Sequence, residues 1–351
     1  MTKIVKLDKK NYRDVVYEAS KILSEGGLVV FPTETVYGLG ADAYITEAVK
    51  KIFRVKGRPH DNPLIVHISN MDMLYKVASN IPDQISTIVK KLWPGPFTVV
   101  LNRGGVPPEV SAGLDTVAVR MPAHPFTLDM ITALGDPVAA PSANKSGRPS
   151  PTKAEHTIND LYGEVDLIVD GGETLYGVES TVIDFTCTPP TLLRPGPLTP
   201  DDLTSLLGID IYIPDYVRRA AKVSRPRSPG MKYRHYAPET KMILVETSDY
   251  SDLDMLVENV SEVVNKYIGR YKIGLLVTDE TVERYKGLTT YILSYGSRSN
   301  LYGIAKNLFR RLREVDELDV DLIISEGFPD EGLGLTIMNR LRKAASEIIK
   351  Y

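Results

Sequence analysis

Between residues 31 and 68 the sequence collects side chains that can bind anions, at the borders of two apolar stretches. The set holds two hydroxyls, two fixed cations, an amide and an imidazole, in the order Thr33, Thr35, Lys56, Arg58, Asn62 and His67. Packing of a hydrophobic core does not require such groups. Several anionic reactants can be held side by side only where fixed cations offset their mutual repulsion. The segment therefore predicts a site for more than one anion.

Lys56 and Arg58 allow two interpretations. They follow an expected helix, and a basic pair at a helix C-terminus often does no more than stabilise the helix dipole. Arg58, however, lies between Gly57 and Pro59, and a proline restricts the backbone of the residue before it. A restricted backbone suits a guanidinium that is aimed at a fixed target.

Further candidates follow downstream, again near the ends of apolar stretches. Arg120 closes one such stretch, a frequent place for a ligand contact, although a surface arginine explains that residue alone equally well. The other candidates are Ser142, Asn144, Ser150, Ser180 and Arg194. The first three follow a buried strand, in a loop that either binds phosphate or sugar through neutral donors or is a plain surface loop.

Common nucleotide motifs are missing from the sequence. Gly38-Leu39-Gly40 follows a strand but lacks the third glycine of a dinucleotide-binding motif, so we expect a turn there. The chain also has no Gly-Lys-Ser/Thr phosphate loop. No nucleophilic serine or cysteine stands out, which favours chemistry by positioning and charge stabilisation.

Composition limits the class of protein. A chain of 351 residues is too long for one ordinary hydrophobic core, so we expect two domains. Its content of 43% hydrophobic and 25% charged residues is that of a globular protein. One cysteine, Cys187, excludes an internal disulfide, and the five histidines lack metal-ligand spacing. Without a signal peptide or a long apolar run, we expect a cytoplasmic protein that contacts no membrane. The net charge of −3 argues against general binding of polyanions.

The elements that must position the candidate residues form two patterns. In residues 1–209, many short strands with few helices predict an α+β domain with a mixed, strongly bent sheet. The expected strands are 28–31, 64–68, 97–101, 117–120, 138–140, 167–169 and 181–185. The expected helices are 8–25, 46–55, 69–78, 83–92, 126–134 and one that begins at Thr152. Thr46 is expected to cap its helix, and Thr152 to form a capping box with Glu155.

Residues 240–351 alternate strands with helices, which is typical of a smaller, Rossmann-like parallel α/β domain. The expected strands are 242–245, 273–277, 290–293 and 322–325, and the expected helices are 253–267, 300–314 and 335–349. Residues 210–239 form a proline-rich linker with seven cations and no acid between Arg218 and Arg234. The linker is either a solvated tether or a basic, aromatic segment that binds RNA or closes over a nucleotide.

Together these blocks resemble the threonylcarbamoyl-AMP synthase family, the YrdC-like proteins, in its long two-domain form. The matching stretches are 31–43, 56–68, 93–98, 117–125, 137–152, 177–185, 192–197, 228–238 and the block from Gly332. The resemblance implies a nucleotidyltransferase that converts L-threonine, bicarbonate and ATP into L-threonylcarbamoyladenylate and pyrophosphate. It also implies a twisted mixed sheet with a concave basic cavity, a Rossmann-like second domain, and a linker that covers the active site.

The resemblance assigns roles to individual residues. Threonine is expected at Thr33, Thr35, His67, Arg120 and Ser180. Catalysis is assigned to Lys56 and Arg58, which hold bicarbonate and the phosphates. ATP is expected at Arg58, Asn62, Ser142, Asn144, Ser150, Arg194 and, in the linker, Arg234. Mg²⁺ is expected to travel with ATP as co-substrate, with no metal site of the protein's own and no tightly bound organic cofactor.

The resemblance further implies partners. The product would serve tRNA threonylcarbamoyl-transfer proteins, which modify the adenosine 3′ of the anticodon in tRNAs that read codons beginning with A. We expect a monomer with at most a weak contact to tRNA. One alternative is a double-stranded RNA or tRNA-binding module without chemistry, whose affinity would depend strongly on salt. Another is carbamoyl transfer from carbamoyl phosphate, but larger relatives that do this add cysteine-rich zinc segments, which one cysteine cannot supply.

Overall fold

The computed structural model describes residues 1–219, 235–289 and 291–351. Contacts divide these residues into two compact units. Unit 1 contains Met1–Ser146 and Ser150–Val217, and unit 2 contains residues 147–149, 218–219, 235–289 and 291–351. The linker that we predict at 210–239 includes residues outside the described ranges, so its boundaries remain a prediction. None of the described helices is long and apolar enough to cross a bilayer.

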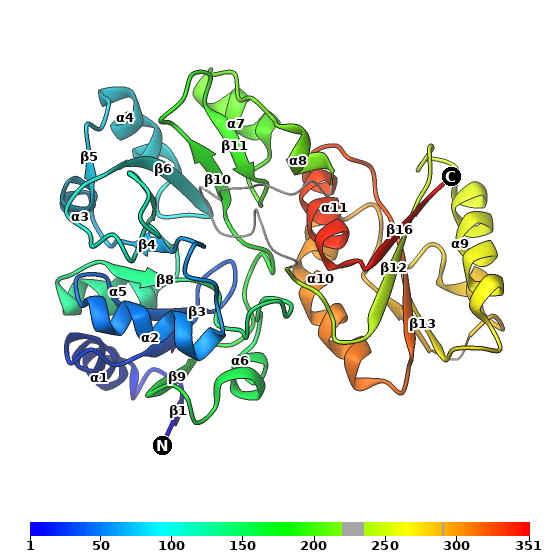
Figure 1. The fold of residues 1–351 in the computed structure, drawn as a ribbon, viewed down its shortest axis with the longest axis horizontal. Coiled ribbons are helices and arrows are strands. Elements are labelled where there is room, and N and C mark those ends of the chain that lie inside the picture. The colour runs from blue at the N-terminus through cyan, green and yellow to red at the C-terminus, as the bar shows by residue number, and fades with distance from the viewer. Residues whose placement is uncertain (220–234, 290) are drawn as a thin grey trace. The chain divides into compact units, whose positions relative to one another are not determined.

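Unit 1 is built on one mixed sheet (Figure 1). Its strands are β1 (Lys3–Lys6), β2 (Val29–Phe31), β3 (Gly38–Asp42), β4 (Ile65–His67), β5 (Ala78–Ser79), β6 (Phe97–Arg103), β7 (Thr116–Arg120), β8 (Val138–Ala140), β9 (Leu167–Asp170), β10 (Thr181–Asp184) and β11 (Thr191–Arg194). Their order in the described part is β1-β9-β2-β3-β8-β4-β7-β6-β10-β11, with β5 paired to β6. Parallel and antiparallel pairs alternate irregularly, as expected for a bent mixed sheet.

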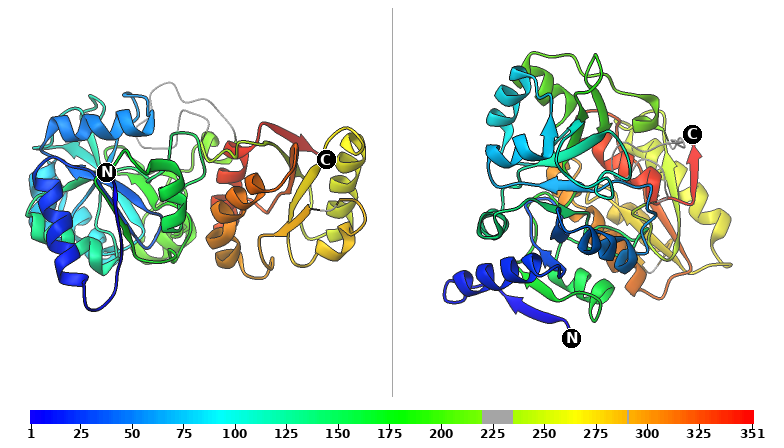
Figure 2. Two further views of the ribbon diagram at one scale, coloured as in Figure 1. Left: turned by 90° about the horizontal axis from the view of Figure 1, so that it is seen from below. Right: turned by 60° about the vertical axis from the view of Figure 1, so that its left-hand side comes forward.

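Helices connect the strands of this unit. They are α1 (Tyr12–Ser24), α2 (Thr46–Lys56), α3 (Met71–Val77), α4 (Asp83–Leu92), α5 (Pro125–Leu134), α6 (Ala154–Leu161), α7 (Pro200–Leu207) and the short α8 (Asp215–Arg218). In α1, for example, Val15, Ala19 and Leu23 are buried at the spacing of one helix face. Figure 2 shows α1 and β1 together at one edge of the unit.

Two predicted helix caps are wrong. The N-cap of α2 is Ile45, so Thr46 is the first helical residue, and the N-cap of α6 is Lys153, which makes no side-chain capping bond. Thr152 lies one residue too early for the capping box that we expected. It is fully buried, and its backbone N–H donates to Nδ1 of His156 instead. The true capping box of the unit lies at Thr199 and Asp202 in front of α7.

The glycines at 38 and 40 lie in a strand, β3, and not in the turn that we expected. A Cβ atom at Gly40 would stand 2.5 Å from Cε1 of Phe31 and 2.7 Å from Cγ1 of Val138, and one at Gly38 would stand 2.9 Å from the same Phe31 ring. Glycine is therefore needed because the Phe31 ring lies flat across this strand. In the sequence the two glycines resemble a turn. In the structure their lack of a side chain allows close packing against the ring.

Replacement of Gly40 by alanine is expected to lower the free energy of unfolding by about 1–3 kcal/mol, since the added methyl group overpacks the core. Denaturant unfolding measures this loss. The companion substitution Phe31→Leu shrinks the clashing ring, so the double variant should be more stable than the sum of the two single losses predicts. Strict additivity would contradict the packing explanation.

Unit 2 is a small parallel sheet with helices on both faces. It contains β12 (Lys241–Glu246), α9 (Leu253–Tyr267), β13 (Ile273–Val277), η1 (Val282–Tyr285), β14 (Tyr291–Ser294), α10 (Leu301–Glu314), η2 (Val315–Glu317), β15 (Leu322–Glu326), α11 (Leu333–Ala344) and β16 (Glu347–Lys350). The strand order is β14-β13-β15-β12-β16, and every pair is parallel. Figure 1 shows α9 on one face and α10 with α11 on the other. The predicted Rossmann-like class is confirmed.

The last predicted helix, 335–349, is wrong at its C-terminal end. Helix α11 stops at Ala344, and Glu347–Lys350 forms β16, an edge strand paired in parallel with β12. Ile348 and Ile349 are β-branched and half-buried, which suits an edge strand. The apolar spacing of this segment fits a helix equally well, and only pairing with β12 decides between them.

Candidate active site

The loop between β2 and β3 carries the first hydroxyls of the site. Oγ1 of Thr33 donates to the carbonyl oxygen of Val36 (2.6 Å) and accepts the backbone N–H groups of Thr35 and Val36. It also lies 2.9 Å from Oγ1 of Thr35. Because the Thr33 proton is already used, Thr35 must be the donor in that pair. Thr33 therefore shapes the loop, and the Thr35 oxygen can still accept a hydrogen bond.

His67 and Arg120 end two adjacent parallel strands in the same register. His67 on β4 pairs with Arg120 on β7, and Arg120 pairs on its other side with Thr98 at the start of β6. Nδ1 of His67 lies 3.2 Å from the carbonyl oxygen of Ile65, and the ring also contacts the backbone of Val138. Burial, and then the positive charge of Arg120, lower the pKa of His67 from 6.5 to about 3. The imidazole is therefore neutral beside the guanidinium.

Replacement of His67 by glutamine is expected to reduce the acid sensitivity of folding. The lowered pKa means that the unfolded chain binds a proton below pH 6.5, whereas the folded chain does so only near pH 3. Stability is thus lost as the pH falls from 6.5 towards 3, by at most about 2 kcal/mol at pH 5. Urea unfolding at pH 7 and pH 5 should show a smaller difference for His67→Gln than for the unchanged chain. The exposed His60 provides the control, and an equal reduction in His60→Gln would contradict this assignment.

Ser180 and Arg194 meet next to this pair. Oγ of Ser180 lies 2.7 Å from Oγ1 of Thr98 and accepts from Nη2 of Arg194 (3.1 Å), whose Nε donates to the Ser180 carbonyl oxygen. All three side chains are buried. Thr98 thus links the two groups: it pairs with Arg120 across β6 and β7, and its hydroxyl contacts that of Ser180, the residue before β10.

Lys56, at the end of α2, holds the loop that follows β8. Its ammonium group donates to the carbonyl oxygen of Ser142 at 2.6 Å and also to that of Asn144. Oγ of Ser142 donates to Oδ1 of Asn144 (2.5 Å), and Ser142 also bridges to Gly38 of β3. The buried ammonium therefore fixes the predicted ATP-binding loop. Its assignment to bicarbonate and phosphate stays a prediction.

Arg58 and Asn62 lie between α2 and β4. Gly57 ends α2 with φ 62°, a left-handed conformation that suits glycine. The Arg58 guanidinium then turns back to donate to the carbonyl oxygens of Asn62 (3.1 Å) and Pro63 (2.9 Å). Oδ1 of Asn62 is buried and accepts no hydrogen bond from the described residues. A buried polar atom without a partner marks a place where a ligand can bind.

The site also contains two carboxylates that we did not single out from the sequence. Oε1 of Glu34 lies 2.6 Å from Nη2 of Arg120, and Oε1 of Glu179 accepts from Oγ of Ser150 at 2.5 Å. Both acids are buried and stand directly beside predicted residues, Thr35 and Ser180. Their only signal in the sequence is that adjacency, because acids next to hydroxyls are common in turns.

The structure thus connects most predicted residues of unit 1 through neighbouring strands and loops. Arg234 lies outside the described residues.

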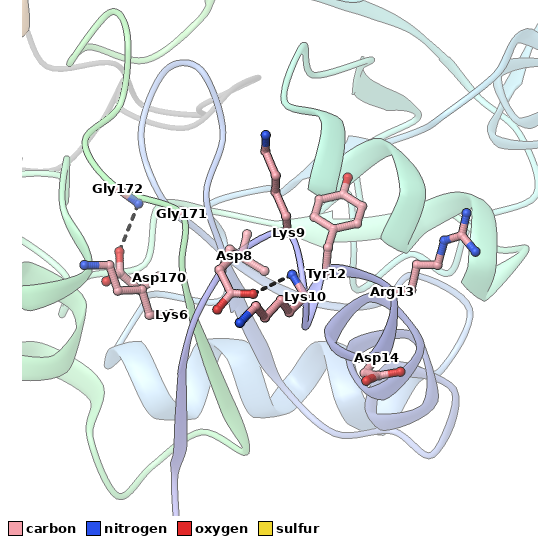
Figure 3. Close-up of a pocket in the computed structure, with 11 residues that line it drawn as sticks. Lys6, Asp8, Lys9, Lys10, Tyr12, Arg13, Asp14, Asp170, Gly171 and Gly172 are labelled. Atoms are coloured by element: carbon pink, nitrogen blue, oxygen red, sulfur yellow. Dashed lines mark hydrogen bonds between the residues drawn. The ribbon is translucent and has the colours of Figure 1, made fainter.

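A separate cavity of about 800 Å³ opens beside β1 and the start of α1 (Figure 3). It is lined by four cations and three acids, two of which, Asp8 and Asp170, accept local backbone N–H groups. None of the predicted site residues lines it.

Comparisons with known proteins agree with this arrangement. Residues 21–196 match the family model Sua5_yciO_yrdC, described as "Telomere recombination", and residues 199–346 match "Threonylcarbamoyl-AMP synthase, C-terminal domain". A threonylcarbamoyl-AMP synthase of Pyrococcus abyssi is 45% identical over 354 residues, with 100% of both chains covered. The chain belongs to the threonylcarbamoyl-AMP synthase family. Members of this family are enzymes of the nucleotidyltransferase class, as predicted.

Further relatives support the same family. A threonylcarbamoyl-AMP synthase of Bacillus subtilis is 45% identical and covers 94% of this chain and 92% of its own length. The crystal structure of P. abyssi Sua5 complexed with L-threonine matches with a TM-score of 0.90 and 43% identity, over 100% of this chain and 99% of that one. The threonylcarbamoyl-AMP synthase fold therefore extends over both units, and the predicted fold class is confirmed.

Proposed function

We propose that the enzyme joins L-threonine, bicarbonate and ATP to form L-threonylcarbamoyladenylate, with release of pyrophosphate. The observation that carries this proposal is the set of buried cations in unit 1: Lys56, Arg58, Arg120 and Arg194. Burial of cations is costly unless anions or carbonyl groups face them. The three reactants bring a carboxylate, a bicarbonate and a triphosphate, so these cations suit them. The P. abyssi relative complexed with L-threonine supports the choice of amino acid.

The threonine half of the site is assigned to the end of β7 and its neighbours. Arg120 would bind the carboxylate of threonine, flanked by Thr35, the neutral His67 and Ser180. Neutral imidazole nitrogen and hydroxyl groups can hydrogen-bond the substrate hydroxyl without adding charge. Thr33 acts through Thr35, because its own hydroxyl is used by the loop.

The ATP half is assigned to the loop after β8 and the residues before β4. Ser142, Asn144 and Ser150 offer neutral hydroxyl and amide groups, Asn62 offers an amide oxygen without a partner among the described residues, and Arg58 and Arg194 offer charge. Arg234 is proposed as a further contact on the basis of the family resemblance alone. Mg²⁺ would enter on the phosphates of ATP and offset part of their charge.

The reaction then has two steps. The ammonium group of threonine first loses a proton to solvent. The neutral amine then attacks the carbon of bicarbonate, and loss of water gives a carbamate. An oxygen of the carbamate attacks the α-phosphorus of ATP, and the bond to the β-phosphate oxygen breaks as pyrophosphate leaves. Arg58, with Lys56 behind the loop, would stabilise the charge on the phosphates, and this stabilisation is the main contribution of the protein. The product would pass to the tRNA-modifying proteins named above, and we propose a cytoplasmic monomer.

The test is incorporation of label. Purified protein is incubated with ¹⁴C-bicarbonate, ATP and L-threonine, and the products are separated quickly. We expect a labelled nucleotide product that also contains threonine and that forms only when all three reactants are present. A second incubation replaces bicarbonate and threonine with ¹⁴C-carbamoyl phosphate. Transfer of that label to a nucleotide product would support carbamoyl transfer and would contradict the proposal.

A further inference from the structure

Glu34 has a buried carboxylate that the assignments above do not use. Its side chain is 6% exposed, and its Oε1 lies 2.6 Å from Nη2 of Arg120. Neither carboxylate oxygen accepts a hydrogen bond of good geometry from the described residues. A buried carboxylate normally accepts several such bonds. One close cation therefore leaves much of its hydrogen-bonding capacity unused.

The position of Glu34 places this capacity in the threonine half of the site. Glu34 lies between Thr33 and Thr35 in the loop after β2, whereas Arg120 ends β7, with β8 and β4 between β3 and β7 in the sheet. The loop must reach across these strands for the two side chains to meet. Within the described residues, Arg120 makes one further hydrogen bond, from its Nε to the carbonyl oxygen of Gly95 (3.3 Å). The rest of its guanidinium can face a ligand beside Glu34.

A free α-amino acid is a zwitterion. It carries a carboxylate and an ammonium group on one carbon, so its complement is a cation and an anion side by side. Arg120 and Glu34 form such a pair, and the His67 imidazole beside Arg120 is neutral. The hydroxyls of Thr33 and Thr35 add no charge.

We propose that Glu34 binds the α-ammonium group of the amino-acid substrate while Arg120 binds its carboxylate. This inference rests on the proposed function, because it assumes that threonine is the amino acid. The ammonium group supplies the hydrogen-bond donors that the Glu34 oxygens lack. Glu34 also orients this nitrogen, which becomes the nucleophile of the first step after the ammonium group has lost a proton.

Two ligands and one substitution test this role by calorimetry. L-Threonine is compared with (2S,3R)-2,3-dihydroxybutanoate, in which a hydroxyl replaces the ammonium group. We expect Glu34→Gln to weaken threonine binding by about tenfold or more, the usual effect of losing a charged hydrogen-bond partner. Binding of the dihydroxy acid should change by less than about threefold, so the two changes are strongly non-additive.

Asp42→Asn is the matched control, because Asp42 is a buried carboxylate of β3 that accepts the backbone N–H of Tyr44. Its threonine affinity should equal that of the unchanged chain. If Glu34→Gln does not fold, Glu34→Asp replaces it. Its shorter side chain should likewise weaken the binding of threonine more than the binding of the dihydroxy acid.

Equal weakening of both ligands would overturn the inference, since it would mean that Glu34 only orients Arg120. Unchanged threonine binding would overturn it too. If the unchanged chain binds ATP but no threonine, the proposed function itself fails, and the inference fails with it.

Discussion

Replacement of Arg58 by alanine is expected to lower turnover by a factor on the order of 10²–10³, the usual effect of losing one preorganised donor to the transition state. Arg58 is buried, and its guanidinium is held by the carbonyl oxygens of Asn62 and Pro63. The left-handed Gly57 ends α2 and directs the chain towards this position. Little reorganisation is then needed when charge develops on the phosphates, so the whole interaction is available to the transition state.

Steady-state pyrophosphate release measures the effect. Arg54→Ala is the matched control, because Arg54 lies on the same helix but is exposed, and its turnover should not change. Arg58→Lys keeps the charge but loses the planar fork of donors, so we expect an intermediate loss. An Arg58→Ala variant that folds and stays within a few-fold of the unchanged enzyme would remove Arg58 from catalysis.

Replacement of Arg120 by alanine is expected to abolish measurable threonine binding and to destabilise the fold by about 3–5 kcal/mol, since it leaves the buried Glu34 charge without its cation. Both effects come from the same 2.6 Å pair. Calorimetry with L-threonine measures the first effect and denaturant unfolding measures the second.

The double variant Arg120→Met with Glu34→Gln separates the two effects. It removes both buried charges, so most of the lost stability should return. Threonine binding should not return, because the charges that would bind the amino acid are gone. A double variant that binds threonine normally would show that this pair is structural only. An Arg120→Ala variant as stable as the unchanged chain would contradict the expected cost of leaving the buried Glu34 charge unpaired.

The sequence predicted elements where local patterns decide them. Strand β8 and helices α4 and α9 match their predicted bounds, because apolar spacing and flanking prolines or caps are local properties. Two of its failures lie where contacts outside the segment decide the structure. The glycine strand β3 depends on the Phe31 ring, and β16 depends on pairing with β12.

For the candidate site, too, local patterns predicted some residues, whereas contacts with other parts of the fold could not be predicted. Residue types at strand ends were enough to propose Arg120, His67 and Ser180, because strand ends are where ligands meet a sheet. Glu34 and Glu179 were missed, since no local pattern shows that the loop after β2 reaches Arg120 or that Ser150 reaches Glu179. Lys56 was singled out by its charge, and its role stays a prediction. Its contact with the carbonyl oxygens of the loop after β8 could not be predicted from its neighbours.

The most direct test of the central claim is the threonine dependence of pyrophosphate release. The full-length chain is incubated with ATP, Mg²⁺ and bicarbonate, and pyrophosphate is followed continuously as L-threonine is added. We predict release only after threonine is added, in proportion to the adenylate formed, and none when bicarbonate is removed. Hydrolysis of ATP at the same rate with and without threonine would contradict the account.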